Sequence, residues 1–155
     1  MNPSALANLN SGIFGQFFGR YAEVFWLLFR IGFAFLVLQH GLQKTFLLWG
    51  FPADHELGAL VDIAGVVELF CAAMIAFGVF TRLAGGAMTV QLVVAYLTAH
   101  SERGFWPHEY EEEGFESLHH GGEVVMAFFL CAGIIGVLGS GKLGLERLIF
   151  KKELF

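Results

Sequence analysis

Four long apolar segments, separated by short polar stretches, follow one another along the 155 residues of the chain. They cover about residues 23–49, 57–80, 83–99 and 121–138. Each is near the length of about 20 residues that crosses the apolar core of a bilayer. Backbone groups in lipid must form their hydrogen bonds within the segment, so the pattern predicts helices. We therefore expect an all-α integral membrane protein, with a single domain over residues 1–155 that forms a four-transmembrane-helix bundle.

Small and aromatic residues refine this picture. Glycines recur inside all four segments, and in membranes small residues let neighbouring helices approach closely. The glycine-rich helix faces predict a compact bundle and are also candidate contacts for partner proteins. Ahead of the first span, aromatic residues recur at helical spacing, at Phe14, Phe17, Phe18, Tyr21 and Phe25. They predict an N-terminal interfacial helix, although contact with a partner protein requires the same pattern.

Charged residues predict the orientation. Basic residues gather on one side of the predicted membrane, at Arg20, Arg82, Lys142, Arg147, Lys151 and Lys152. Because positive residues stay in the cytoplasm, we expect both termini there and a multi-pass protein of a prokaryotic cytoplasmic (inner) membrane. Much of the net charge of −5 falls in an acidic loop, about residues 101–118, which we expect outside as a contact for a partner. No basic patch with interleaved aromatics exists, so nucleic acid is not an expected partner.

Overall composition supports a membrane environment. Hydrophobic residues make up 56% of the chain, above the apolar usage of about 45–50% in soluble domains. The mean hydropathy of the chain is +0.65. Both cysteines, Cys71 and Cys131, lie inside apolar segments. They are expected to be buried free thiols, because a disulfide would require the two helices to meet at that depth.

Polar residues in the first span form a candidate site. His40, Gln43 and Lys44 share one helix face by their spacing of three and four, and Arg30 lies near the same stripe about four turns away. In the structural interpretation, Lys44 extends outward to the membrane surface and His40 joins two helices by a hydrogen bond. In the functional interpretation, these side chains bind a ligand or carry chemistry, because ionisable residues within spans usually face the bundle interior or a wet cavity.

Glu68 lies about eleven residues into the second span and hence near the middle of the bilayer, at a rise of about 1.5 Å per residue. Gly65 and Ala72 share its face, so this surface should press against another helix. A buried carboxylate must lose its charge or find a cation. We expect either a structural pair with Arg30 or Lys44, or a functional role.

The fourth span opens with "SLHHGGEVVMAFFL". His120 lies three residues and His119 four residues before Glu123, so each pair occupies one helix face. A metal can use such spacing, but di-iron bundles place the Glu before the His and use the motif twice, so the metal signal is weak. His100, at the end of the third span, is either a further member of this cluster or an interfacial residue.

A family resemblance is carried by "LLFRIGFAFLVLQHGLQKTF", "VVELFCAAMIAFGVFTRLAG", "GFWP" and "HGGEVVMAFFL". These stretches resemble the DoxX family of small four-span membrane proteins. The resemblance implies a prokaryotic membrane protein related to the membrane subunit of thiosulfate:quinone oxidoreductase. Matched by motif, the polar positions of the family are Arg30, His40, Lys44, Glu68, Thr81, Arg82 and Glu123. The acidic stretch "HEYEEEGFESLHH" departs from the family pattern and is the feature most particular to this chain.

The resemblance and the polar residues together predict a membrane subunit of a redox system that binds quinone or a similar electron carrier in the outer half of the bundle. The expected chemical residues are His40, Lys44, Glu68 and Glu123. The expected cofactor-binding residues are Arg30, Gln43, His100, His119 and His120. We predict that His40, Glu68 and Glu123 lie in one connected polar network.

Two alternatives stay open. In the first, the chain is a non-catalytic accessory or assembly subunit of a larger membrane complex, and the polar cluster joins its helices. In the second, it binds haem or a metal through His40 with His100, His119 or His120. The sequence does not decide whether the chain is itself an enzyme, as a quinone-linked oxidoreductase subunit would be.

Overall fold

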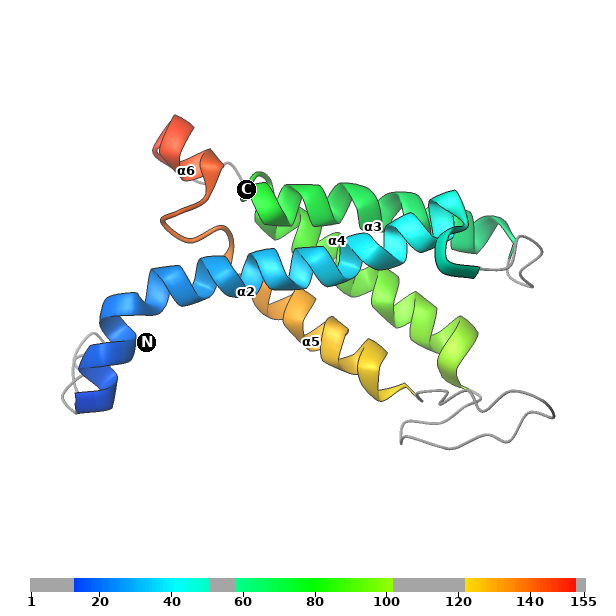
Figure 1. Cartoon of the computed structure of the whole chain (residues 1–155), viewed down its shortest axis with the longest axis horizontal. Helices are drawn as coiled ribbons and strands as arrows, with labels where there is room; N and C mark the ends of the chain where they lie inside the picture. The colour runs from blue at the N-terminus through cyan, green and yellow to red at the C-terminus, as the bar shows by residue number, and fades with distance from the viewer. Residues whose placement is uncertain (1–12, 51–57, 102–121, 153–155) are drawn as a thin grey trace.

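The structure of the protein is a computed structural model that describes residues 13–50, 58–101 and 122–152 (Figure 1). Every described element is helical. The α-helices are α2 (Ile13–Phe46), α3 (Ala59–Phe77), α4 (Thr81–Ala95), α5 (Glu123–Leu138) and α6 (Leu145–Phe150). A 3₁₀ turn, η1 (Leu48–Gly50), follows α2, and a π-helical turn, η2 (Tyr96–His100), extends α4.

The helices form two packed pairs around one core. α2 packs chiefly on α3 and α4 packs chiefly on α5, while a short turn links α3 to α4 (Figure 1). Each of the four helices contributes a fully buried side chain to the core, Val37, Ile75, Met88 and Ile135 in chain order. Both Cys71 and Cys131 are free thiols, as predicted, but only Cys71 is buried while Cys131 is half-buried.

The helices suit a bilayer. Three are long and apolar enough to cross one, over Phe14–Phe46, Ala59–Phe77 and Thr81–His100. Their outer faces carry exposed large apolar side chains such as Phe70 and Val90, which lipid would cover. The all-α membrane class is therefore confirmed. α5 has 16 residues and rises about 24 Å, short of a hydrocarbon core about 30 Å thick, so the fourth span stays a prediction.

The aromatic segment before the first span is the beginning of α2. It is helical, as predicted, and it continues without interruption into the spanning part because no proline lies between Ile13 and Phe46. Figure 1 shows that α2 bends near its N-terminal end, so the aromatic segment leaves the direction of the span. Phe14, Phe17 and Phe18 are all exposed there.

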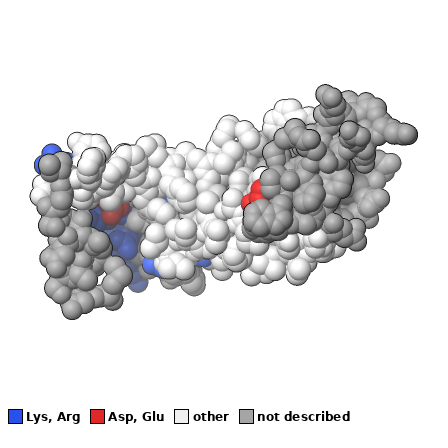
Figure 2. All heavy atoms as spheres, turned by 90° about the horizontal axis from the view of Figure 1, so that it is seen from below, with Lys and Arg blue, Asp and Glu red and all other residues white. Residues whose placement is uncertain are grey.

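The same end of the molecule holds the start of α2, the turn between α3 and α4, and α6 (Figure 1). We call it the basic end, defined by Arg20, Arg82, Lys142, Arg147, Lys151 and Lys152. Figure 2 shows Lys and Arg side chains gathered there. η1, η2 and the start of α5 lie at the opposite end (Figure 1).

Gly78 makes the turn between α3 and α4 possible. Its φ of 71° is left-handed, and its N–H donates to the Met74 carbonyl at 3.0 Å, which closes the last turn of α3. A Cβ at this position would lie 2.6 Å from Gly144 Cα and 2.7 Å from Arg30 Nη1. Only glycine allows three parts of the chain to meet there.

A glycine contact joins α4 to α5 and gives a direct test of the packing. A Cβ on Gly85 would lie 2.5 Å from the backbone nitrogen of Gly136, whereas a Cβ on Gly86 would meet nothing within 4 Å. We expect Gly85→Ala to lower the free energy of unfolding by about 1–3 kcal/mol, because two backbones must separate. Unfolding in mixed detergent micelles measures it.

The matched control is Gly86→Ala, which adds the same methyl group one residue away. It should leave stability unchanged or raise it by up to about 1 kcal/mol, because alanine favours the helix. Equal losses in the two variants would contradict the packing of α4 on α5.

Candidate functional site

A buried polar cluster joins α2, α3 and α4 near the end opposite the basic end. It consists of Lys44 in the last turn of α2, Glu68 in the middle of α3, and Gln91 in α4. Glycines bring α2 and α3 together at this level. A Cβ on Gly41 would lie 3.0 Å from the Leu69 backbone nitrogen, and one on Gly65 would lie 2.9 Å from Lys44 Cβ. This close approach lets the Lys44 side chain reach Glu68.

One oxygen of Glu68 receives two donors. Lys44 Nζ lies 2.5 Å from Glu68 Oε1, and Gln91 Nε2 donates to the same oxygen at 2.8 Å. Gln91 Nε2 also lies 3.3 Å from the Ala64 carbonyl oxygen, one turn earlier on α3. The side chain of Glu68 is 6% exposed and that of Lys44 is 21% exposed. An ion pair and a neutral donor thus compensate the buried charge and tie three helices together.

Three polar atoms in and beside this cluster are buried without a hydrogen-bond partner among the described residues: Glu68 Oε2 and Gln91 Oε1, and Thr45 Oγ1 of the residue after Lys44. Buried polar atoms are normally bonded, and each one left unbonded costs about 1–3 kcal/mol. Two of the three are oxygens that only accept. The cluster therefore has unused capacity for a molecule that donates hydrogen bonds.

His40 borders this cluster. It lies one turn before Lys44 on α2, is exposed, and interacts electrostatically with both Lys44 and Glu68. Its ring meets Phe128 of α5 edge-on, with 5.7 Å between ring centroids and 72° between planes. His40 thus stands between the charged pair and α5. Gln43, next to Lys44 in sequence, is half-buried.

The remaining predicted residues divide into three groups. Glu123 is half-buried in the first turn of α5, and its place in one network with Glu68 stays a prediction. In η2, His100 Nδ1 lies 3.2 Å from the Ala95 carbonyl oxygen of the same chain segment. His119 and His120 fall outside the described residues. Within the described part of the chain, no three His, Cys, Asp or Glu side chains form a group that could hold a metal.

Arg30 does not join Lys44 and Glu68. It precedes Lys44 by 14 residues, about 21 Å along the helix, and lies near the basic end. Its side chain is fully buried, and Nη1 donates to the Ile75 carbonyl at 2.8 Å. Of the two predicted partners of Glu68, Lys44 is therefore the one that the structure selects.

Arg30 belongs instead to the packing around the turn after α3. The two family positions beside that turn are placed similarly: Thr81 is buried at the start of α4, and Arg82 donates to the Val137 carbonyl of α5. Arg30 and Arg82 thus each bond to the backbone of another helix at the basic end. None of them is among the residues that bring a donor to Glu68.

The sequence did not lead us to two residues, Gln91 and Glu146. Gln91 had a usable signal, since a polar amide in the middle of an apolar helix is expected to face another helix. Glu146 had none. It is 2% exposed in α6, where its Oε2 accepts from the Phe80 N–H at 2.9 Å while its own N–H donates to the Gly78 carbonyl at 3.2 Å. Its partners depend on how the chain reverses after α5.

The chain after α5 is also tied to α2. Trp26 Nε1 donates to the Gly139 carbonyl at 3.0 Å, and the Lys142 N–H donates to Glu23 Oε2 at 2.8 Å. Together with Glu146, these contacts hold residues 139–150 across the basic end. They concern the structure of that end and bring no further group to the Lys44–Glu68–Gln91 cluster.

Comparisons with known proteins agree with this organisation. Residues 25–101 match the DoxX family model, a range that contains Lys44, Glu68 and Gln91 and ends before Glu123. An uncharacterized protein of Haemophilus influenzae is 28% identical over 140 residues, which make up 86% of this chain and 96% of that protein. No solved structure matches the chain. The family is a membrane family, loosely related to a redox-associated membrane subunit.

The two partners of the ion pair should differ in the cost of their removal. Lys44→Met leaves the Glu68 carboxylate buried without its cation, and we expect a loss of about 3–5 kcal/mol in the free energy of unfolding. Glu68→Gln should cost less, about 1 kcal/mol, because the partly exposed Lys44 ammonium can turn towards the membrane surface. Unfolding in mixed micelles compares the two variants.

The double variant Lys44→Met with Glu68→Leu serves as the control, because it leaves neither charge buried. It should recover much of the stability that Lys44→Met loses. A larger loss for Glu68→Gln than for Lys44→Met, or no recovery in the double variant, would show that the pair does not hold α2 to α3.

Proposed function

We propose that the chain, which matches the DoxX family model over residues 25–101, is a membrane subunit of a redox system that binds quinone or a similar electron carrier beside Lys44, Glu68 and Gln91. One observation carries the proposal. The cluster of these residues keeps buried acceptor oxygens, Glu68 Oε2 and Gln91 Oε1, that no described residue occupies. A carrier that gains and loses hydroxyl groups matches this unused capacity.

The donor and acceptor groups of the cluster fit both forms of such a carrier. The Lys44 ammonium has further N–H groups that can donate to a quinone carbonyl, and the free oxygens of Glu68 and Gln91 can accept from the hydroxyls of a quinol. A quinone takes up two electrons and two protons when it becomes a quinol. Lys44 and Glu68 can hold and exchange these protons, while the electrons must come from a partner protein.

His40 extends the proposed site towards the surface of the end opposite the basic end. It is exposed and interacts with both charges, and its two ring nitrogens can donate and accept. We assign it the transfer of protons between the cluster and the outer surface. Glu123, Gln43 and His100 complete the site in this proposal, with His119 and His120 ahead of α5. Arg30 lies too far along α2 to share it.

A second candidate function is that of a non-catalytic accessory or assembly subunit. It is favoured by the way Glu68 receives donors from two other helices, since such a cluster also serves to hold a bundle together. Hydrogen bonds of this kind contribute about 0.6 kcal/mol on average in membranes. Partner proteins would then meet glycine-rich helix faces or the acidic loop of residues 101–118.

Retention of quinone separates these two functions. We expect the full-length protein, purified in mild detergent, to carry quinone that organic extraction and chromatography detect. His40→Ala and Glu123→Gln should each lower the ratio of quinone to protein by about tenfold, the loss of one hydrogen bond to a charged group. Thr98→Ala is the control, because Thr98 is exposed near the same end and bonds to its own helix at the Val94 carbonyl.

An absence of quinone, together with unaltered activity of the complex in both variants, would remove the redox function. Failure of a complex to assemble without this chain, while His40→Ala and Glu123→Gln assemble normally, would establish the accessory function instead.

We propose further that α5 is the fourth span and that the basic end faces the cytoplasm of a prokaryotic inner membrane. α5 packs along α4, a spanning helix, and places Ile135 in the shared core, so both lie at the same depth. The gathering of cations at one end supports the orientation. The similar protein of Haemophilus influenzae is bacterial.

Reporter fusions test this topology. A fluorescent protein fused after Phe155 should fluoresce, since it would stay in the cytoplasm, and alkaline phosphatase fused there should be inactive. The same reporters inserted after Gly50, at the opposite end, should give the reverse pattern and act as the control. Active phosphatase at both positions would mean an odd number of spans, and activity at the C-terminus alone would mean the reverse orientation; either result contradicts the proposed topology.

A further inference from the structure

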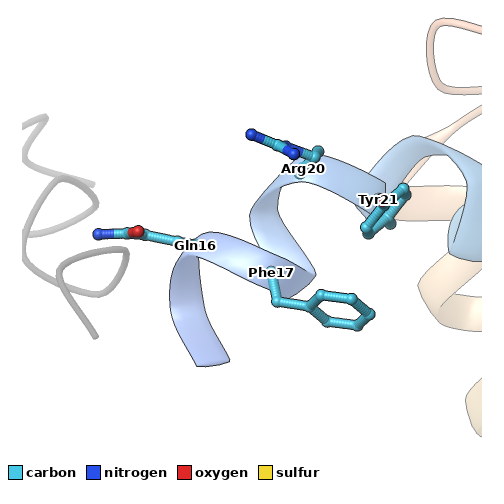
Figure 3. A pocket seen from close by; sticks show the side chains of 4 residues that line it. All are labelled: Gln16, Phe17, Arg20 and Tyr21. Atoms are coloured by element: carbon cyan, nitrogen blue, oxygen red, sulfur yellow. The ribbon is translucent and has the colours of Figure 1, made fainter. Parts of the chain in front are cut away.

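The start of α2 has a surface that the proposed redox site does not use. Gln16, Phe17, Arg20 and Tyr21 line a hollow with a volume of about 240 Å³ at the basic end (Figure 3). All four residues lie on two successive turns of one helix, before its apolar spanning part. Each of the four side chains is exposed.

The spacing of these residues separates them by chemistry. Gln16 and Arg20 are four apart and so are Phe17 and Tyr21, which places each pair on its own side of the helix. Figure 3 shows the two polar side chains pointing away from the two rings. The rings contact one another with 5.0 Å between centroids, and Phe14, Phe18 and Phe25 extend the aromatic stripe. The helix start is amphipathic.

Arg20 brings a charge that no described residue neutralises. It is exposed and forms no ion pair with any residue of the described ranges, whereas Lys142 nearby at the basic end has Glu23 at 3.8 Å. Further cations gather at the same end (Figure 2). A basic patch beside a membrane attracts anionic headgroups, and an arginine fork matches the oxygens of a phosphate.

We infer that the hollow binds the headgroup of an anionic phospholipid. Arg20 and Gln16 hold the phosphate, while Phe17 and Tyr21 enter the boundary of the acyl chains. The bend of α2 and its continuity with a span place this segment at headgroup depth, where amphipathic aromatic helices lie (Figure 1). An exposed aromatic stripe opposite an exposed cation is complementary to a lipid surface, which offers acyl chains and negative charge together.

Native mass spectrometry of the full chain tests the site with two defined lipids, phosphatidylglycerol and phosphatidylcholine. We expect phosphatidylglycerol to bind more tightly. Arg20→Gln should weaken its binding about fivefold and leave phosphatidylcholine unchanged, because one cation near the surface is removed. Gln16→Ala is a second variant in the same hollow and should weaken both lipids alike, because the phosphate that Gln16 holds is common to both headgroups.

The matched control is Lys152→Gln, which removes one exposed positive charge at the same end but outside the hollow. It should change phosphatidylglycerol binding less than twofold. Equal losses for Arg20→Gln and Lys152→Gln would mean only diffuse attraction between the basic end and the lipid. Unchanged lipid binding in Arg20→Gln, with loss of a co-purifying protein, would mean a protein contact. Either result overturns the lipid site. Quinone retention in Arg20→Gln should stay at its wild-type value, which separates this site from the redox function.

Discussion

A carboxylate in the middle of an apolar helix is the constraint on which the packing of this protein depends. Moving an ion out of water costs several kcal/mol, so Glu68 requires a cation within contact distance. Lys44 can supply it only if α2 and α3 approach closely, and Gly41 and Gly65 remove the side chains that would keep them apart. Gln91 bonds to the same oxygen, which also fixes where α4 lies. The close packing of these helices and the compensation of the Glu68 charge therefore depend on each other.

The basic end solves a different problem with similar residue types. There the groups that need partners belong to the backbone, at the turn between α3 and α4. Arg30 satisfies the Ile75 carbonyl, and Glu146 satisfies both the Phe80 N–H and the Gly78 carbonyl. Buried backbone groups must be bonded because water does not reach them. The buried charges of this end are thus explained by structure, without reference to a ligand.

How far the sequence predicts this molecule depends on the range of each interaction. Hydropathy depends on consecutive residues, so the helical segments and the membrane class follow from it. The partner of Glu68 was narrowed to Arg30 or Lys44, but the choice required the packing of α2 on α3, which no local pattern determines. The contacts of Glu146 and Trp26 depend on the path of the chain after α5. Gln91 could have been predicted from the sequence, because a polar amide is unusual among the apolar residues around it.

Both ends hold buried polar atoms that no described residue bonds, Thr81 Oγ1 at the basic end and Glu68 Oε2 with Gln91 Oε1 in the cluster, and those of the cluster are oxygens that only accept. A cluster that serves only to join helices gains most when every polar atom is bonded, because each orphan costs about 1–3 kcal/mol. Glu68 joins three helices through one oxygen and keeps the other buried and unbonded among the described residues. An apolar residue at Gln91 would remove one such cost, but it would also remove the donor to Glu68. His40 interacts electrostatically with Glu68, and we propose that the residues that hold the bundle together also form the redox site.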